Sequence, residues 1–335
     1  MTNKLLSQIR KAADVADVHV DTLLSNISVA YLQDEGEFIA NKVFPVLPVA
    51  KQSDKYMSFP KRTFMTDRAK KWVPGTAMPQ SEFDVNTDGS YACEFRGFEY
   101  PQRWDIRANA DNIIGFDRAS VEYVSRILLL GREIEWATKY FTTLTWGKDY
   151  TGVASGPTGD QFIQWNEEAG DPIGDYKTGR LFIKKNTGYT PNTAVMSQEV
   201  FEEVCENAGV KEKYKYTRPG MLTEDIIADV LRVKNLYIAG SINITSDEGV
   251  VTGSETYDWI YGKNAWLGYV PPAPSLLTPA AGYIFSWTGM TGGFETAIER
   301  IPDRRVKADY IQGVSCFDMG TVSTDLGVFF SGAVG

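Results

Sequence analysis

The sequence predicts an α+β protein with a mixed sheet, and three observations support this class. A long amphipathic helical pattern covers residues 117–144. Between residues 171 and 288, capped helical segments alternate irregularly with short strand-like runs, and the tail from residue 293 onward is strand-like throughout. A doubly wound parallel protein would alternate helices and strands regularly. The irregular order therefore favours α+β over α/β.

The composition describes a folded, acidic protein. The chain has 335 residues, 34 Lys and Arg against 43 Asp and Glu, a net charge of −9 and 43% hydrophobic residues. This apolar content excludes the disordered class, and the length allows one large or two ordinary domains. Proteins that grip nucleic acid need clustered cations to displace counterions, so the acidic balance argues against that role as the main task.

The sequence contains no membrane, secretory or disulfide signature. The longest uninterrupted apolar run is Ile127–Leu130, far short of the roughly 20 residues of a membrane span. No apolar block follows the first cations, which excludes a secretory signal. Cys93, Cys205 and Cys316 are odd in number and far apart, as expected of reduced thiols rather than a disulfide frame or a zinc site.

Residues 1–50 are predicted to form an N-terminal arm. Residues 2–14 have the spacing of a short amphipathic helix. The arm ends in Val43–Val49, where Pro45 and Pro48 favour extended backbone and forbid an interior strand. We expect this segment to lie on the surface of another part of the protein.

Residues 51–100 are predicted to form an extended loop built as a long β-hairpin. Two strand-like runs, Lys55–Met65 and Ser90–Tyr100, flank roughly 25 residues rich in Arg, Lys, Pro, Gly and Asp. Connections this long are uncommon in compact domains and are usually functional or mobile. A paired hairpin of this kind would project from the body with too little core to be stable alone.

The segment 101–171 contains the longest helix, predicted over residues 117–144. Asp117 is the expected N-cap, and about 28 residues at 1.5 Å each give a rod of roughly 40 Å. The apolar spacing alternates between three and four residues and continues to Leu144. The predicted core of this helix is Ile127, Leu130, Ile134, Ala137 and Phe141.

Residues 172–288 are predicted to form a mixed α/β unit, followed by strands over 289–335. Three helices are expected to start after Asp171, Ser197 and Thr223, because these side chains cap free N–H groups. Glycines at 188 and 209 are the expected stops of the first two, and 211–216 is expected to be a solvated linker or, alternatively, a pore-facing loop. Strands are predicted at 193–196, 236–244, 265–270 and 283–287, and a long hairpin within 306–330.

No constellation for catalysis, cofactor binding or metal binding is found. The single histidine, His19, lies in the arm, whereas a general base must be held beside its nucleophile. Ser58–Lys61 and Lys177–Gly179 match two motifs of serine β-lactamases, but the third motif is missing and Pro60 would break the required helix. No phosphate-binding glycine motif is present. We expect no enzyme, no cofactor and no metal.

Charge in the extended loop offers candidate contacts between subunits. The outgoing part is basic and the return is acidic, so the loop is either a solvated tip or a finger that pairs with acidic neighbours of its own kind. The candidate contact residues are Lys61, Arg62, Arg68, Lys70, Lys71, Glu82 and Asp84.

Several segments, in this order, resemble one family. They are Leu24–Tyr31, Val43–Pro45, Gln52–Tyr56, Arg107–Asp111, Arg132–Ala137, Trp146–Gly147, Trp165 and Asp171–Asp175. Together they resemble the major capsid proteins of tailed bacteriophages over most of the first 200 residues. The resemblance implies the Hong Kong 97-like capsid fold. It assigns 1–50 to the N-arm, 51–100 to the extended loop, 101–171 and 289–335 to a peripheral domain whose spine helix is 117–144, and 172–288 to the axial domain.

The resemblance implies a structural subunit of an icosahedral capsid. Copies are expected to self-assemble into pentamers and hexamers that enclose weakly contacted double-stranded DNA, each extended loop lying across a neighbour. Implied partners are a separate scaffolding protein and a portal protein, and the resemblance leaves open whether a decoration protein also binds. No membrane contact is implied. The chain would be assembled in the bacterial cytoplasm and reside in the virion capsid, without covalent cross-links. The alternative is a phage decoration or tail structural protein, which would lack the combination of spine helix and long loop.

Overall fold

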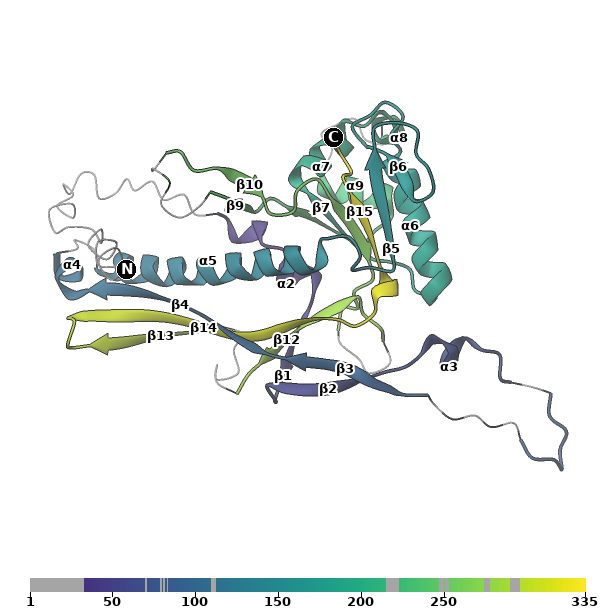
Figure 1. Ribbon diagram of the computed structural model, residues 1–335, viewed down its shortest axis with the longest axis horizontal. Coiled ribbons are helices and arrows are strands. Elements are labelled where there is room, and N and C mark those ends of the chain that lie inside the picture. Colours follow the sequence, from purple (N-terminus) through teal and green to yellow (C-terminus); the bar gives the residue numbers. More distant parts are fainter. Residues whose placement is uncertain are drawn as a thin grey trace.

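A computed structural model gives the fold of the chain. It describes residues 33–69, 71–78, 80, 82, 84–109, 113–214, 223–246, 250, 253–273, 278–289 and 296–335. Two main sheets organise it, joined by one long helix (Figure 1). His19 and the helix predicted over residues 2–14 lie outside the described residues.

The first sheet is five-stranded and elongated. Its centre is β14 (Ala308–Thr321), which pairs antiparallel with β13 (Thr296–Asp303), with β4 (Glu94–Arg103) and, near its end, with β12 (Gly282–Trp287). The edge strand β1 (Val46–Val49) runs parallel to β12. An edge position tolerates Pro48, which cannot donate to the ladder, so the prediction that this part of the arm avoids a sheet interior is confirmed.

The second sheet is six-stranded and mixed, as predicted. Its order is β6 (Gln161–Ile163), β5 (Lys148–Val153), β15 (Gly327–Ser331), β11 (Ala265–Gly268), β7 (Thr193–Ser197) and β8 (Asn235–Ala239). Only β11 runs antiparallel to its neighbours. A separate hairpin pairs β9 (Ile242–Ile244) with β10 (Tyr257–Trp259).

The chain passes between the two sheets more often than the expected boundaries at 171/172 and 288/289 imply. β5 and β6 come from 101–171 and β15 from 289–335, yet all three join the six-stranded sheet. β12 comes from 172–288 and joins the five-stranded sheet. The long tail hairpin is β13 with β14 rather than a pair within 306–330, since β15 turns away after η3 (Thr324–Leu326). Local sequence patterns do not encode such distant pairings.

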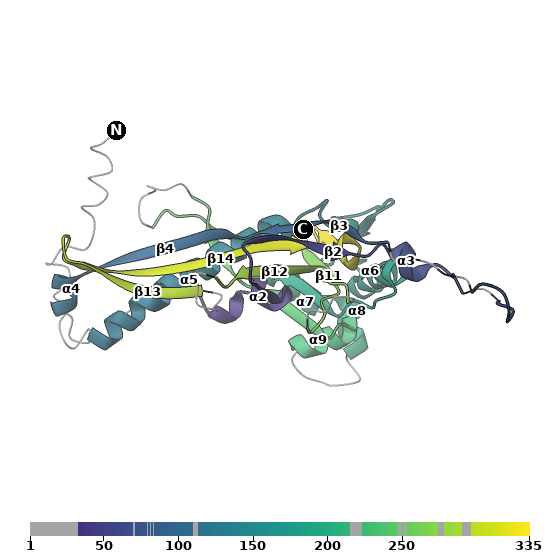
Figure 2. The same ribbon diagram turned by 90° about the horizontal axis from the view of Figure 1, so that it is seen from below.

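The spine helix α5 covers Ile113–Tyr140 and lies along the five-stranded sheet (Figures 1 and 2). Its 28 residues match the predicted length, but the helix sits four residues earlier in the sequence than predicted. Asp117 is therefore inside the helix and is not its cap. Phe141 follows the helix and remains buried, whereas Leu144 is 95% exposed in a left-handed turn with φ of 66°.

The helices beside the six-stranded sheet begin close to where their caps predict. α6 (Pro172–Thr187) starts after Asp171, which accepts from the Gly174 N–H at 2.9 Å, and ends at Gly188 with φ of 77°. α7 (Gln198–Glu206) is capped by Ser197, but the prediction that Gly209 stops it is wrong: the helix ends before its C-cap Asn207, and Gly209 lies inside the next helix. The expected linker is wrong over most of its length, because α8 (Ala208–Tyr214) follows at once. α9 (Glu224–Leu231) starts after Thr223, without a side-chain cap bond.

The extended loop is a hairpin at its root only. β2 (Ser53–Ser58) pairs with β3 (Asn86–Ala92), and the chain between them projects from the body (Figure 1). The strand predicted over Lys55–Met65 stops at Ser58, because Pro60 precedes the short helix α3 (Lys61–Met65). The second predicted strand is two: β3 faces β2, and β4 joins β14.

Aromatic side chains join the two sheets. Phe44, from the turn after α2 (Ala40–Val43), lies 5.4 Å from Trp136 of α5 between ring centroids. Trp146 and Trp266 extend the cluster at 5.2 Å from each other. One continuous core therefore holds the described arm, the spine helix and the six-stranded sheet together. None of the helices in the described segments is both long and apolar enough to cross a bilayer.

Candidate assembly surfaces

The extended loop exposes an unusual amount of apolar surface. The sequence predicted contacts from the charged residues of this loop, but the structure also exposes many of its large apolar side chains. These apolar side chains follow no helical or strand period, so the sequence pattern did not single them out. Burying such side chains removes apolar area from water, which the loop cannot do alone. In the described part of the loop, the exposed large apolar residues are Met57, Phe64, Met65, Trp72, Val73, Met78, Val85 and, on β4, Phe95.

Five of the seven predicted charged contacts already have partners within the chain: Lys61, Arg62, Arg68, Glu82 and Asp84. Arg62 lies 3.6 Å from Asp84 across the loop, and Arg68 donates to the Glu82 carbonyl at 3.4 Å. Lys61 pairs with Asp325 beside η3, at the base of the six-stranded sheet. Lys71 is exposed, and Lys70 lies outside the described residues. These pairs are solvent-exposed and individually weak, so a neighbour can replace them at low cost.

The root of the loop is anchored firmly to the body. Tyr91 and Tyr56 stack on Phe285 of β12, with ring centroids 4.8 and 5.7 Å away. The Asp318 carboxylate accepts from the Ala92 N–H at 3.0 Å, and Cys93 is buried beside these rings. A rigid root with a projecting tip is a geometry suited to reaching over a neighbouring molecule.

A polar clamp holds the arm on the spine helix. The buried Glu133 carboxylate accepts from the backbone N–H groups of Ile39 and Ala40, both at 2.9 Å, and from the Tyr261 hydroxyl. The adjacent Arg132 donates to Asn41 at 3.0 Å, and its guanidinium lies 4.5 Å from the Phe317 ring centroid. Burial raises the pKa of Glu133, against the three hydrogen bonds that favour the carboxylate.

A second network closes the end of the spine helix farthest from the six-stranded sheet. Asp117 accepts from Arg107 at 2.8 and 3.0 Å and from Gln102 at 2.7 Å, and Arg300 lies 3.3 Å away. Arg300 also bonds Asp309 of β14. The Arg107 bonds, opposed by partial burial, hold the pKa of Asp117 down at about 2. This network ties α4 (Trp104–Asn109), α5, β4, β13 and β14 together.

The predicted core residues of the spine helix divide into two groups. Ala137 and Phe141 are buried, whereas Ile127, Leu130 and Ile134 are half-buried. The residues that the helix buries most completely are Val124, Trp136 and Tyr140. The half-buried row runs along one side of the helix, and in the single subunit it is only partly covered.

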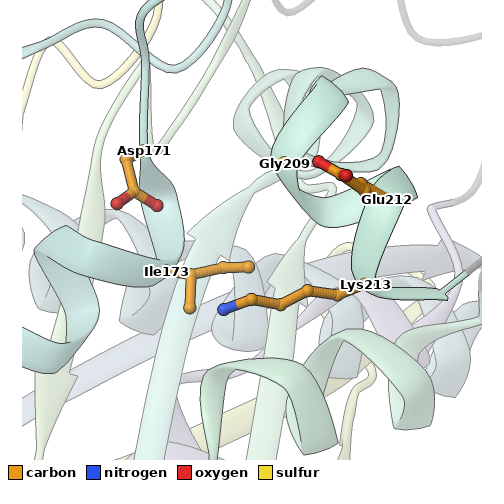
Figure 3. Close-up of a pocket in the computed structure, with 5 residues that line it drawn as sticks. All are labelled: Asp171, Ile173, Gly209, Glu212 and Lys213. Atoms are coloured by element: carbon orange, nitrogen blue, oxygen red, sulfur yellow. The ribbon is translucent and has the colours of Figure 1, made fainter.

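The chemistry of the described residues gives no active-site geometry. An open hollow of about 710 Å³ lies between the start of α6 and α8, lined by Asp171, Ile173, Gly209, Glu212 and Lys213 (Figure 3). It contains no nucleophile with an adjacent base. Burial raises the pKa of the Cys93 and Cys205 thiols to about 11. In the described part of the chain, no three His, Cys, Asp or Glu side chains group as metal ligands.

Comparison with known proteins gives one curated relative and several similar structures. The chain is 23% identical over 252 residues to the major capsid protein of Burkholderia phage BcepMu, covering 75% of this chain and 76% of that protein. No protein-family model matches the sequence.

Two solved structures share nearly the whole fold. A phage-related protein from Bordetella bronchiseptica RB50 is 21% identical and covers 90% of this chain and 94% of its own, with a TM-score of 0.68. The capsid of cyanophage P-SCSP1u is 10% identical and covers 96% and 95%, with a TM-score of 0.59. The predicted Hong Kong 97-like capsid fold is therefore confirmed.

Proposed function

We propose that this chain is the structural subunit of an icosahedral bacteriophage capsid. The observation that carries the proposal is the combination of a 28-residue spine helix with a projecting loop, in a fold shared with a phage capsid over nearly the whole chain. The sequence similarity to a phage major capsid protein supports the same role. A decoration or tail protein is not favoured, because such a protein has no need of this combination.

In the proposed shell, the extended loop lies across a neighbouring subunit. Its exposed apolar side chains are then buried against that neighbour. Its weak internal ion pairs are exchanged for ion pairs with that neighbour. Contact roles are proposed for Lys61, Arg62, Arg68, Lys70, Lys71, Glu82 and Asp84. The half-buried row Ile127, Leu130 and Ile134 becomes better covered in the assembled wall.

The assignment of segments follows the same proposal. Residues 1–50 form the N-arm, 51–100 the extended loop, 172–288 most of the axial domain, and the flanking segments most of the peripheral domain. Copies form pentamers and hexamers around their axial domains. A scaffolding protein, a portal protein and, where the shell carries one, a decoration protein complete the assembly in the host cytoplasm.

The proposed role is mechanical and uses no catalysis, cofactor, metal or membrane. The net charge of −9 suits a container, because duplex DNA is repelled by an acidic wall rather than held on it. The virion capsid is the proposed site of action.

Deleting residues 66–85 tests the role of the loop. The deletion leaves β2, β3 and their contacts with Phe285 and Asp318 in place, so we expect folded subunits with an unchanged circular dichroism spectrum. We also expect that these subunits no longer form shells in electron micrographs. Shells of normal size and yield from the deletion variant would show that the loop is dispensable for assembly.

A further inference from the structure

The helices beside the six-stranded sheet carry opposite charges. On α6, the exposed side chains Lys177, Lys184 and Lys185 share one face with Leu181, which is 55% exposed. Their spacing of four, seven and eight residues from Lys177 places them on one stripe of a helix. We call Lys177, Leu181, Lys184 and Lys185 the lysine stripe. Among the described residues, none of these lysines forms an ion pair.

The acidic counterpart lies on α7. This helix has four glutamates and no basic residue, and Glu202, Glu203 and Glu206 are exposed. We call Glu202, Glu203 and Glu206 the glutamate face. Its only described cationic contact is Lys211 of α8, beside Glu206. The face therefore keeps an excess of negative charge.

The two surfaces lie on different helices, and among the described residues no lysine of the stripe pairs with a glutamate of the face. α6 packs on β11 and β15 through Gly179, where an added Cβ would lie 3.2–3.4 Å from Phe330, Leu267 and Val328. The lysine stripe is on the opposite, outer side of that helix. Figure 1 shows α6 along one flank of the six-stranded sheet and α7 towards the other. Within the described residues of one copy, the lysine stripe and the glutamate face therefore do not neutralise each other.

We propose that the lysine stripe of one copy docks on the glutamate face of a second copy. Such a contact is heterologous, and repeated head to tail it closes a ring. The inference rests on the proposed function and names the contact that would join neighbours inside each pentamer and hexamer. Leu181 supplies an apolar centre with charged residues around it, and complementary charge fixes register and partner.

Charge reversal on each side tests this contact. The double variant Lys184→Glu with Lys185→Glu places an acidic stripe opposite the acidic glutamate face. The double variant Glu202→Lys with Glu203→Lys places a basic face opposite the basic lysine stripe. Like charges repel each other across an interface, so we expect each variant to lose about tenfold or more of its assembled fraction. The variant with all four changes keeps the net charge of −9 and is expected to assemble again. Circular dichroism checks that each variant is folded.

Mixing the two reversed variants gives a sharper result. Copies can then dock only in alternation, which closes rings with an even number of members. We expect hexameric rings, sheets or tubes in electron micrographs, without the pentamers that closed shells need. Normal shells from either reversed variant alone, or a fourfold variant that assembles no better than they do, would overturn the inference.

Two further outcomes separate this inference from its alternatives. If Lys184→Glu with Lys185→Glu forms normal shells that no longer retain duplex DNA, the stripe is a DNA contact and the inference is overturned. If the unaltered chain never assembles, the proposed function itself fails. If the unaltered chain and each of the two reversed variants form shells when tested separately, only the docking contact is overturned.

Discussion

At the scale of single residues, Glu133 does most to fix the arm. Its carboxylate is the acceptor for two backbone N–H groups and one hydroxyl, all from elements distant in sequence. A buried donor left without an acceptor costs about 1–3 kcal/mol. We expect Glu133→Ala to lower the free energy of unfolding of the unassembled subunit by about 3 kcal/mol or more, measured by urea unfolding.

Glu122→Ala is the matched control on the same helix. Glu122 pairs with Arg118 at 3.1 Å on the exposed side, where such pairs contribute little. We expect a change of no more than about 0.5 kcal/mol. Equal losses in the two variants would show that the clamp adds nothing beyond an ordinary surface glutamate.

At the scale of elements, the Asp117 network makes the end of the five-stranded sheet acid-sensitive. Its folded pKa of about 2 lies below the ordinary 3.8, mainly because Arg107 donates to the carboxylate. A lowered pKa means that the charged form is stabilised by folding. This contribution is present above pH 3.8 and is lost as the pH falls towards 2.

We expect thermal unfolding to reveal this loss between roughly pH 5 and pH 2. The unfolding temperature of the unaltered chain should fall more steeply over this range than that of Asp117→Asn, which has no charge to lose. Asp229→Asn, exposed on α9, is the control and should follow the unaltered chain. Parallel curves for Asp117→Asn and the unaltered chain would contradict the role of this carboxylate.

The same residue shows where local patterns stop being sufficient. Asp117 looks like a helix cap in the sequence, but α5 begins four residues earlier, at Ile113, and the Asp117 carboxylate accepts from Arg107, Gln102 and Arg300. By contrast, Asp171, Pro172 and Gly188 act within one or two turns, and they place α6 correctly. Caps are predictable when their partners are close in sequence.

The sheet that a strand joins and the side chains that form a contact surface also depend on partners that are distant in sequence or absent from the single subunit. The strands β11, β12 and β15 were predictable as strands, but the sheet that each joins depends on pairings across tens to hundreds of residues. The apolar side chains of the extended loop are exposed in the single subunit, and no periodicity distinguishes them from a buried strand. The charged candidates were visible because clustered charge is itself a sequence pattern.

At the scale of the whole molecule, the elements are arranged along one long axis. The long strands and the spine helix form an elongated layer, the six-stranded sheet lies at one end, and the loop projects beyond it (Figure 2). Residues 33–50 and the aromatic cluster around Trp136 hold these parts as one core. In the proposed shell, the exposed apolar loop and the oppositely charged helices make their contacts with other copies.

The most direct test of the central claim is electron microscopy of the purified chain, alone and co-expressed with a candidate scaffolding protein, with the particle mass from light scattering. The account predicts closed icosahedral shells, or the pentameric and hexameric rings from which they are built. A monodisperse monomer or small closed oligomer under every condition would contradict it.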